Sequence, residues 1–463
     1  MKNWNQLFIR QGWLLQEDGE NHFNCAQETD ANMAFLLVSL DTVQAEYIYS
    51  EHEQTLQMKS AAMTEEAWLQ AVDVRHRGGN GFVGTPTEYL EVERLDLYCS
   101  GIVRQLNRLH QKTVASCDGH GRGRSAHITF SKEDDVDLEM VEYLLELELP
   151  RVSRQERENS ITFKLGSRCV EHLNLAETLS KIPVEWLDRG TDYMKQQLFN
   201  ATLEELLMIP GASGAEGPIR KTVMKKLAPY VDRMTVDHYG NILAEKTYRS
   251  GNGPTIMLNA HLDVVEEMVE GRKIMKDNGI WSSSDGILGA DDRAGVAVVL
   301  EVAKSLQQDR DFSGKVKYIF TVEEEVGLIG ARNVAEYFLW DIDAAMVIDR
   351  RGTGDIVTSC RGAVAFCDAA YGEWIEQQAI EAELDGWRCT AGGSSDTRIW
   401  VQHGIQSVNL SAGYYNEHTE AERLDVNACY NTVKLVKTAL KNGRSLRSVL
   451  RTNRLEPVTL RLR

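Results

Sequence analysis

Five short segments in the second half of the chain carry histidines and carboxylates, the side chains that most often bind metals or transfer protons. They are His261-Leu262-Asp263, Asp291-Asp292, Glu323-Glu324-Glu325, Asp349 and His418. Any one segment has an ordinary explanation, such as acidic residues that favour the first turn of a helix. Together they offer imidazole nitrogen and carboxylate oxygen without thiolate, which is the donor set of a catalytic zinc site with an open coordination position.

The same segments could serve two metal ions. Two metals about 3.5–4 Å apart share a bridging carboxylate and take terminal ligands on each side. The chain supplies a candidate bridge, two histidines, further acids and a spare glutamate. A hydrolytic site needs this spare carboxylate, because a base must accept a proton from the attacking water. The residue types therefore indicate metal-assisted hydrolysis.

The elements expected to position these residues alternate between strand and helix. The runs are TIMLNAHLD, AGVAVVLEVAKSLQQ, KVKYIFTVEEE, GARNVAEYFLW and AAMVIDRR. This alternation indicates crossover connections and a largely parallel sheet covered by helices. In such sheets functional residues collect at the carboxyl ends of strands, and His261, Glu324 and Asp349 each fall where a strand is expected to end.

Composition narrows the class of protein. The 463 residues, 43% hydrophobic and 26% charged, fit a soluble globular protein of two or three domains. The net charge of −18 argues against nucleic acid or an anionic membrane as a partner. The N-terminus lacks the apolar core of a signal peptide, and no apolar run approaches the ~20 residues that cross a bilayer. Eight cysteines without a CxxC pair indicate reduced thiols. We therefore expect a cytoplasmic protein without a membrane or nucleic-acid partner.

The first 190 residues are expected to form a smaller α/β region. Residues 86–112 and 135–147 have a helical pattern, whereas 113–117 (TVASC) and 126–131 (AHITFS) have a strand pattern. A helical stretch from about Pro183 to Leu207 joins this region to the second half. Cys117 ends the first of these strands, Asp118 and His120 follow it, and His127 lies close by; we interpret this cluster as a Gly-rich hairpin turn with incidental polar residues rather than as a second metal site.

The second half resembles a known family over residues of about 195–440. LLMIPGASGAEGPIRKTVMKKLAPYVDRMTVDHYGNILAE is similar to the opening helix and Asp-x-x-Gly-Asn hairpin of the glutamyl-aminopeptidase branch of the di-zinc exopeptidases. NAHLDVV, LGADDRAGVA, TVEEEVGLIGA and MVIDRRG continue the resemblance, which includes the peptidase T-like branch. SSDTRIWVQHGIQSVNLSAGYYNEHTEAE also resembles the Ser-Asp-His and His-Thr segments of leucine-aminopeptidase-like relatives. Five motifs in the family's order make the resemblance specific.

The resemblance implies a metal-binding role for five residues. His261 and Asp349 would bind the first zinc, and Glu325 and His418 the second. Asp291 would bridge both ions. Cobalt or manganese could replace zinc, because these donors discriminate weakly among the three metals.

Further roles fall on neighbouring residues. Glu324 would be the general base, and Asp263 would hydrogen-bond the His261 imidazole and fix its tautomer. The choice of Glu324 follows from motif alignment, and the adjacent Glu323 is the alternative if the alignment is shifted by one residue. Asp292 is expected to keep the ordinary role of an acid at a helix start.

The chain departs from the family in its insertions. Only 30 positions separate His261 from Asp291, which leaves no room for the domain that the glutamyl-aminopeptidase branch inserts there. The 69 positions between Asp349 and His418 are already needed for strands and helices of the core, so the lid and dimerisation domain of the peptidase T-like branch is also expected to be absent. We hypothesise that the N-terminal half replaces the missing insert by covering the active-site mouth or mediating assembly.

The predicted fold is α/β: a three-layer catalytic domain with a mostly parallel mixed sheet between helices, plus a smaller N-terminal α/β region. The expected domains are residues 1–190, whose role is unknown and which could divide into 1–85 and 86–190, then a di-zinc peptidase domain at 191–445, then a basic tail at 446–463. The last 20 residues, which include this tail, carry six arginines against one glutamate.

The predicted function is hydrolysis of peptide bonds by an aminopeptidase that acts on small peptides, with homo-oligomerisation left open. One alternative is a deacylase or carboxypeptidase with the same metals and base, in which a basic residue would bind a substrate carboxylate. The candidates for that basic residue are Arg350, Arg351, Arg361 and Arg388. The other alternative is a non-catalytic binding or regulatory protein that kept the fold.

Overall fold

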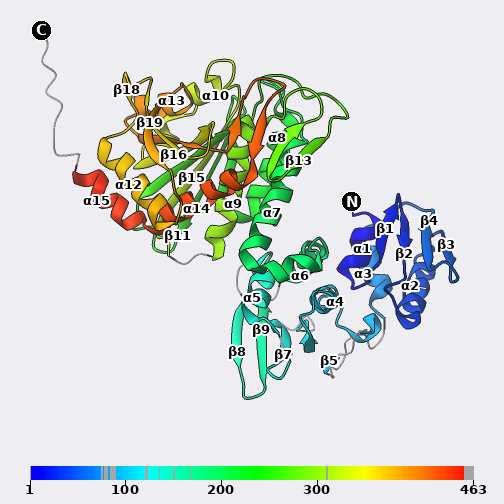
Figure 1. Cartoon of the computed structure of the whole chain (residues 1–463). Coiled ribbons are helices and arrows are strands. Elements are labelled where there is room, and N and C mark those ends of the chain that lie inside the picture. The colour runs from blue at the N-terminus through cyan, green and yellow to red at the C-terminus, as the bar shows by residue number, and fades with distance from the viewer. Residues whose placement is uncertain are drawn as a thin grey trace, which may run out of the picture. The chain divides into compact units, whose positions relative to one another are not determined.

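The computed structural model describes residues 2–452 except 75, 76, 78–81, 84–89, 120–123, 135, 150, 151, 167, 309 and 310. The chain divides into two compact units, residues 1–195 and 196–463 (Figure 1). The boundary falls inside helix α7, Gly190–Leu207, which follows a 3₁₀ turn at Val184–Arg189. Among the described residues, no helix combines the length and the apolar character that crossing a bilayer requires.

The N-terminal unit begins with an antiparallel sheet in the order β1-β2-β4-β3 and three helices. Their bounds are β1 Gln16–Gly19, β2 His22–Asn24, β3 Tyr47–Ser50, β4 Thr55–Met58, α1 Trp4–Arg10, α2 Asp30–Thr42 and α3 Glu65–Val72. Trp4, Phe8, Trp13 and Trp68 are almost fully buried and form an aromatic cluster with edge-to-face and tilted ring contacts. Such rings bury a large apolar area, which supports a small separate core.

A second antiparallel sheet in the same unit has the order β5-β6-β7-β9-β8. Its strands and the helices beside it in the chain are β5 Phe82–Val83, β6 Thr113–Cys117, β7 Ala126–Ser131, β8 Ser153–Glu156, β9 Ser160–Gly166, α4 Ser100–Arg108, α5 Leu138–Glu146 and α6 Cys169–Ser180. The two strands predicted at 113–117 and 126–131 are confirmed as β6 and β7. His120, which lies between these strands in the sequence, is outside the described residues.

The helix predicted over residues 86–112 is wrong in its extent. The described part of that stretch forms a 3₁₀ turn at Val92–Arg94 and then α4, while residues 86–89 lie outside the described residues. Helix α4 ends before His110, whose φ of +60° is a left-handed conformation that terminates a right-handed helix.

The C-terminal unit is built on a nine-stranded mixed sheet in the order β10-β11-β15-β12-β16-β20-β17-β18, with β19 paired to β17. The strands are β10 Arg233–Val236, β11 Ile242–Tyr248, β12 Thr255–His261, β15 Gly314–Thr321, β16 Ala344–Arg350, β17 Asp355–Cys360, β18 Val364–Ala365, β19 Arg388–Gly392 and β20 Gln406–Ser411. The four central strands β15, β12, β16 and β20 run parallel, whereas β10, β11 and β18 join by antiparallel pairing. The carboxyl ends of the central strands therefore lie at one edge of the sheet.

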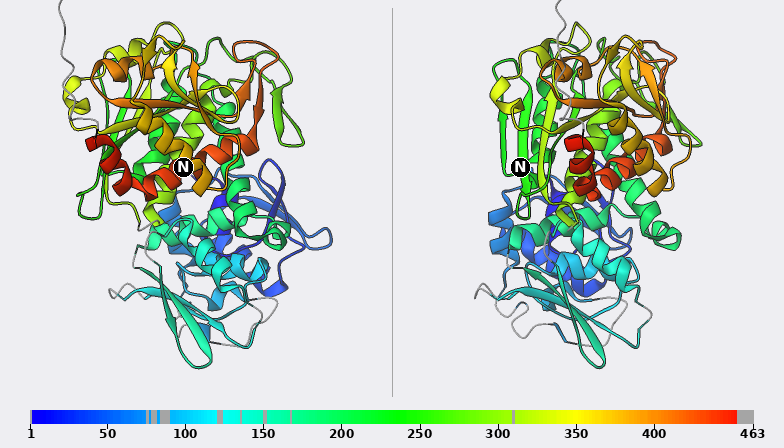
Figure 2. Two further views of the ribbon diagram at one scale, coloured as in Figure 1. Left: turned by 60° about the vertical axis from the view of Figure 1, so that its left-hand side comes forward. Right: turned by 90° about the vertical axis from the view of Figure 1, so that its left-hand side faces the viewer.

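Helices cover both faces of this sheet, as Figures 1 and 2 show. Alternate residues of β12 enter different cores: Ile256 and Leu258 pack on one face and Met257 on the other. Helices α7, α8, α9, α12 and α14 contribute to the first core, and α10, α11 and α13 to the second. The helix bounds are α8 Gly217–Leu227, α9 Ala290–Gln308, α10 Ile329–Arg332, α11 Glu336–Leu339, α12 Ala369–Glu381, α13 Thr397–Gln402, α14 Val426–Lys441 and α15 Gly443–Thr452. The predicted three-layer α/β fold with a mostly parallel mixed sheet is confirmed.

Four short strands form a small antiparallel sheet in the order β13-β14-β22-β21. Its strands are β13 Ile274–Asp277, β14 Ile280–Ser283, β21 Tyr414–Tyr415 and β22 Arg423–Asp425. In the sequence, β13 and β14 precede Asp291, and β21 and β22 lie before and after His418. The stretch between His261 and Asp291 thus contains a single hairpin. The stretch between Asp349 and His418 contains only elements of the two sheets and their helices, so neither family insertion is present.

Two local expectations differ from the structure. GARNVAEYFLW forms two short helices, α10 and α11, because the chain between them turns at Asn333 and Val334. The basic tail expected at 446–463 begins inside helix α15, where Arg447 donates a hydrogen bond to the Asn252 carbonyl at 2.6 Å. Residues 453–463 lie outside the described residues.

Candidate metal centre

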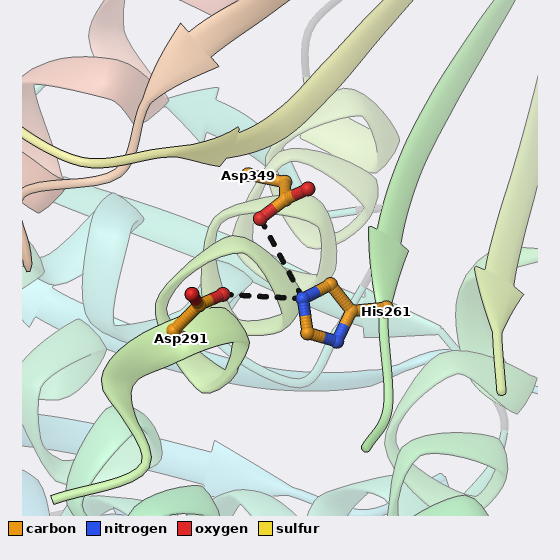
Figure 3. Close-up of side chains that lie close together, drawn as sticks. All are labelled: His261, Asp291 and Asp349. Atoms are coloured by element: carbon orange, nitrogen blue, oxygen red, sulfur yellow. Dashed lines mark hydrogen bonds and ion pairs between the residues drawn. The ribbon is translucent and has the colours of Figure 1, made fainter. Parts of the chain in front are cut away.

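Five predicted ligands meet at the carboxyl edge of the central strands. They form two groups, His261–Asp291–Asp349 and Asp291–Glu325–His418, within each of which the potential ligand atoms lie within 4.8 Å of one another. Asp291 belongs to both groups. Figure 3 shows the first group, with Asp291 and Asp349 on the same ring nitrogen of His261.

His261 is the last residue of β12, and its side chain is only 2% exposed. Its Nε2 lies 3.1 Å from Asp291 Oδ1 and 3.5 Å from Asp349 Oδ1. The other ring nitrogen, Nδ1, lies 3.0 Å from the backbone carbonyl of Asp263 and 3.4 Å from its carboxylate. A proton on Nδ1 satisfies these acceptors and leaves the Nε2 lone pair for a metal.

Asp291 directs its two oxygens to different histidines. Oδ1 faces His261, and Oδ2 lies 3.2 Å from His418 Nε2. His418 Nε2 lies 2.9 Å from Glu325 Oε1. A carboxylate with one oxygen toward each ligand group has the arrangement that a bridge between two cations requires.

The Asp291-Asp292 pair precedes the regular part of α9. Asp291 (φ −81°, ψ 104°) and Asp292 (φ −119°, ψ 38°) are not helical, and the peptide bond between them is cis. Asp292 is fully buried, and its side chain accepts hydrogen bonds from the backbone N–H groups of Gly295 (3.0 Å) and His261 (3.2 Å). The expected helix-start role of Asp292 is confirmed, and the same side chain also ties α9 to the end of β12.

The approach of α9 to the sheet explains Gly295. A Cβ on Gly295 would lie 1.9 Å from the Ile348 carbonyl and 2.5 Å from both Asp292 carboxylate oxygens. Any larger residue would therefore push the helix start away from β16, the strand that carries Asp349.

Asp349 is fixed by its backbone and by its side chain. Its N–H donates to Asn409 Oδ1 and its carbonyl accepts from Asn409 Nδ2, both at 2.9 Å. The Tyr414 hydroxyl donates to Asp349 Oδ1 at 3.0 Å. These bonds hold the carboxylate beside His261.

The acidic turn after β15 is held by Asp263. The Glu324 N–H donates to Asp263 Oδ1 at 3.0 Å, and the Glu325 N–H donates to Oδ2 at 3.1 Å. Ser213 Oγ donates to the same Oδ2 at 2.8 Å. Burial alone would raise the pKa of Asp263, but hydrogen bonds from His261, the Glu324 amide and Ser213 outweigh it and lower the pKa to about 2. Asp263 is thus an ionised acceptor at the centre of the site.

Glu323 occupies a different place in this turn. It has a left-handed φ of +51°, and its N–H donates to Glu216 Oε1 at 3.2 Å. Glu216 Oε1 also accepts from the Gly214 N–H at 2.8 Å. The segment that contains Ser213 and Glu216 therefore contacts both the acidic turn and Asp263, which follows β12.

The carboxylates of the site are crowded. Burial is the largest cause that raises the pKa of Glu324 to about 10, of Glu325 to about 7 and of Asp349 to about 6, with repulsion from neighbouring carboxylates adding to each. A divalent cation favours the ionised form of such groups, because it replaces the lost hydration by direct coordination. The donor set, two imidazole nitrogens and three carboxylates in two groups around a shared one, fits a pair of metal ions.

Several residues that support the site were missed by the sequence analysis. They are Ser213, Glu216, Asn409, Tyr414 and Glu422. All five lie inside segments whose resemblance was noted, and Ser213, Glu216 and Glu422 fall in the stretches GASGAEG and HTEAE. Their contacts are to backbone amides or to other supporting groups, and a sequence pattern carries no direct signal of these.

Two of the arginines considered for substrate carboxylate binding already have partners. Arg350 donates to Asp355 Oδ2 through Nε at 3.0 Å and Nη2 at 2.9 Å. Arg351 Nη2 lies 2.8 Å from Glu417 Oε1. Both guanidinium groups therefore already have a carboxylate partner.

A family model matches a segment that contains Asp291, Glu325, Asp349 and His418. The M42 glutamyl aminopeptidase family model matches residues 288–435. A putative aminopeptidase of Acetivibrio thermocellus is 24% identical, covering 51% of this chain and 97% of the relative. A peptidase T-like protein of Yersinia pestis is 32% identical over 108 residues, which are 23% of this chain and 26% of the relative.

The aminopeptidase PepT from Bacillus cereus covers 53% of this chain and 98% of that chain, with 19% sequence identity and a TM-score of 0.48. The chain is thus similar to the M42 glutamyl aminopeptidase family over residues 288–435, and to aminopeptidase and peptidase T-like relatives over 51% and 23% of its length.

Proposed function

We propose that this protein is an aminopeptidase that cleaves small peptides with two zinc ions and a glutamate base. The observation that carries the proposal is the position of Asp291, whose two oxygens face two separate ligand groups. His261 and Asp349 would hold the first ion, and Glu325 and His418 the second.

The chemistry divides between the ions and the protein. Bound zinc lowers the pKa of a coordinated water toward ~7 and polarises a carbonyl. Glu324 accepts the proton of the attacking water and returns it to the nitrogen of the departing amine. Burial raises the pKa of Glu324 in the metal-free protein, and the positive charge of two bound cations would oppose this rise and favour the ionised form that can accept a proton.

Asp263 contacts ligands of both proposed ions and the proposed base. Its backbone carbonyl and carboxylate face His261 Nδ1, and its carboxylate accepts from the amides of Glu324 and Glu325. It therefore orients one ligand of the first ion, one ligand of the second and the base through a single buried side chain.

Other features of the proposal rest on the family resemblance and on composition. Cobalt or manganese could take the place of zinc. We expect a cytoplasmic protein that acts on peptides and not on nucleic acid or membranes. Assembly into a homo-oligomer, and a role for the N-terminal region in covering the site or in that assembly, stay predictions.

The competing functions give different substrate preferences. A deacylase or carboxypeptidase would need a cation for the substrate carboxylate, and the pairing of Arg350 with Asp355 and of Arg351 with Glu417 leaves Arg361 and Arg388 for that role. A non-catalytic binding protein would hydrolyse none of the substrates. Free tripeptides, N-acetylated tripeptides and N-acetyl amino acids distinguish the three.

The test combines this panel with Glu324→Gln and the matched control Glu323→Gln in the zinc-loaded protein. We expect cleavage of free tripeptides only, a loss of kcat by several orders of magnitude in Glu324→Gln with zinc content retained, and a change below about tenfold in Glu323→Gln. Preference for N-acetyl amino acids would favour the deacylase. Near-normal hydrolysis by Glu324→Gln would contradict the proposed base.

A further inference from the structure

Glu422 is a buried carboxylate, 2% exposed, that lies just before β22 and four residues after His418. Its Oε2 accepts a hydrogen bond from the Gly289 N–H at 2.7 Å, and its Oε1 accepts one from the Asp291 N–H at 3.0 Å. Both oxygens are thus directed at the turn that carries the proposed bridging residue.

The turn that Glu422 holds has no regular structure to satisfy its amides. Gly289 has a φ of +74°, and the backbone is non-helical at Asp291 and Asp292. Gly289 and Asp291 are both buried, so water cannot easily replace an acceptor there. The positive φ of Gly289 favours glycine at this position, because residues with a Cβ rarely adopt it.

The segment that carries Glu422 also supplies one of the proposed metal ligands. His418 faces Asp291 Oδ2 with its Nε2 at 3.2 Å. One short stretch, residues 418–422, therefore contacts Asp291 twice: through the imidazole at its carboxylate and through Glu422 at its backbone N–H. Any shift of the turn relative to this stretch would change the distance between the bridge and the second ligand group.

We propose that Glu422 is a positioning residue that fixes the backbone of Asp291, and so keeps its carboxylate between the two metal-ligand groups. The inference rests on the proposed function of Asp291 as a bridge, and it adds a residue 131 positions away to that site. Glu422 acts through Asp291, because its own oxygens are engaged by the two amides.

The need for a carboxylate follows from the geometry. The two amides contact different oxygens of Glu422. A glutamine has one acceptor oxygen, so its NH₂ group would face one of the two N–H donors whichever way the amide is turned. Glu422→Gln keeps the volume of the side chain while it loosens one of the two bonds.

The test uses the full-length protein after metal removal, with Glu422→Gln, Glu422→Ala and the matched control Glu420→Gln. Glu420 lies two residues away in the same segment and is exposed. Zinc affinity and stoichiometry are measured by competition with a chelating dye, kcat and KM with a free tripeptide, and the thermal midpoint of each metal-free protein by circular dichroism.

We expect Glu422→Gln to weaken zinc binding by about 10- to 100-fold and to lower kcat at least tenfold while KM changes less than about threefold. Glu420→Gln should match the wild type within about twofold in every measurement. If Glu422→Ala does not fold, the isosteric Glu422→Gln carries the test alone.

Two outcomes overturn the proposal and can be told apart. A Glu422→Gln protein that binds two zinc ions with wild-type affinity, with or without a lower thermal midpoint, limits Glu422 to ordinary packing. A wild-type protein that binds fewer than two zinc ions removes the bridge itself, and with it both the proposed function and this inference.

Discussion

Replacement of Asp263 by asparagine should damage the site in a direction that the structure specifies. The Asp263 carboxylate has donors on both oxygens: the Glu324 N–H and His261 Nδ1 at Oδ1, and the Ser213 hydroxyl and Glu325 N–H at Oδ2. An asparagine must place its NH₂ group at one of these positions. At Oδ2 the Ser213 hydroxyl can turn and accept, so only the Glu325 N–H loses its acceptor. At Oδ1 both the Glu324 N–H and the imidazole would be opposed, which makes that orientation the less favourable one.

The size of the effect follows from the single amide that is left without an acceptor. An unsatisfied buried N–H costs about 1–3 kcal/mol, which corresponds to about 5- to 150-fold in an equilibrium constant. Because the affected amide belongs to Glu325, we expect the loss mainly in binding of the ion that Glu325 and His418 would hold. Ionic attraction from the carboxylate is also lost, so the upper half of the range is expected.

The assay is a zinc titration of the metal-free protein, resolved into two binding steps, with kcat measured at saturating zinc. Asp343→Asn is the matched control, because Asp343 Oδ2 accepts from the Thr255 N–H at the opposite end of β12. The control should leave both zinc steps unchanged. If Asp263→Asn binds both ions as the wild type does, the carboxylate does not position Glu325 and the reasoning fails.

Two further predictions concern stability. Removal of metal with a chelator should lower the thermal midpoint of the C-terminal unit, because a ligand at 100 times its Kd adds about 2.7 kcal/mol to the free energy of unfolding. An unchanged midpoint in calorimetry would show that no ion binds the folded form. Burial lowers the pKa of His172, which is 1% exposed and whose Nδ1 has no hydrogen-bond partner among the described residues. The folded state therefore favours neutral His172, so its contribution to stability is present above pH ~6.5 and is lost as pH falls from there toward the lowered pKa. The urea-unfolding midpoint should fall between pH 7.5 and 5 by more in the wild type than in His172→Phe, and equal falls would contradict the assignment.

The layers of the C-terminal unit could be predicted from the sequence because each strand there is a short apolar run followed by a polar residue with clear chemistry. His261 ends β12 and Asp349 lies near the end of β16, as the alternation of strands and helices indicates. Parallel strands bring these ends to one edge, so the sequence alone predicts that these two residues, 88 positions apart, lie close together.

Contacts between a side chain and a distant backbone amide could not be predicted from the sequence. Glu422 bonds to the Asp291 amide across 131 positions, and Glu216 to the Glu323 amide across 107. Backbone amides have the same chemistry at every position, so no residue pattern marks which amide a carboxylate will find. The end of the helix predicted over 86–112 was placed too late for a related reason, since the residue type of His110 does not indicate its left-handed conformation.

The central claim is that Asp291 bridges two metal ions, and anomalous X-ray diffraction from crystals grown with zinc tests it most directly. We expect two peaks about 3.5–4 Å apart, one about 2.0–2.2 Å from His261 Nε2 and Asp349, the other at the same distance from His418 Nε2 and Glu325, with one Asp291 oxygen on each. A single peak, or two peaks of which only one contacts Asp291, would contradict the claim.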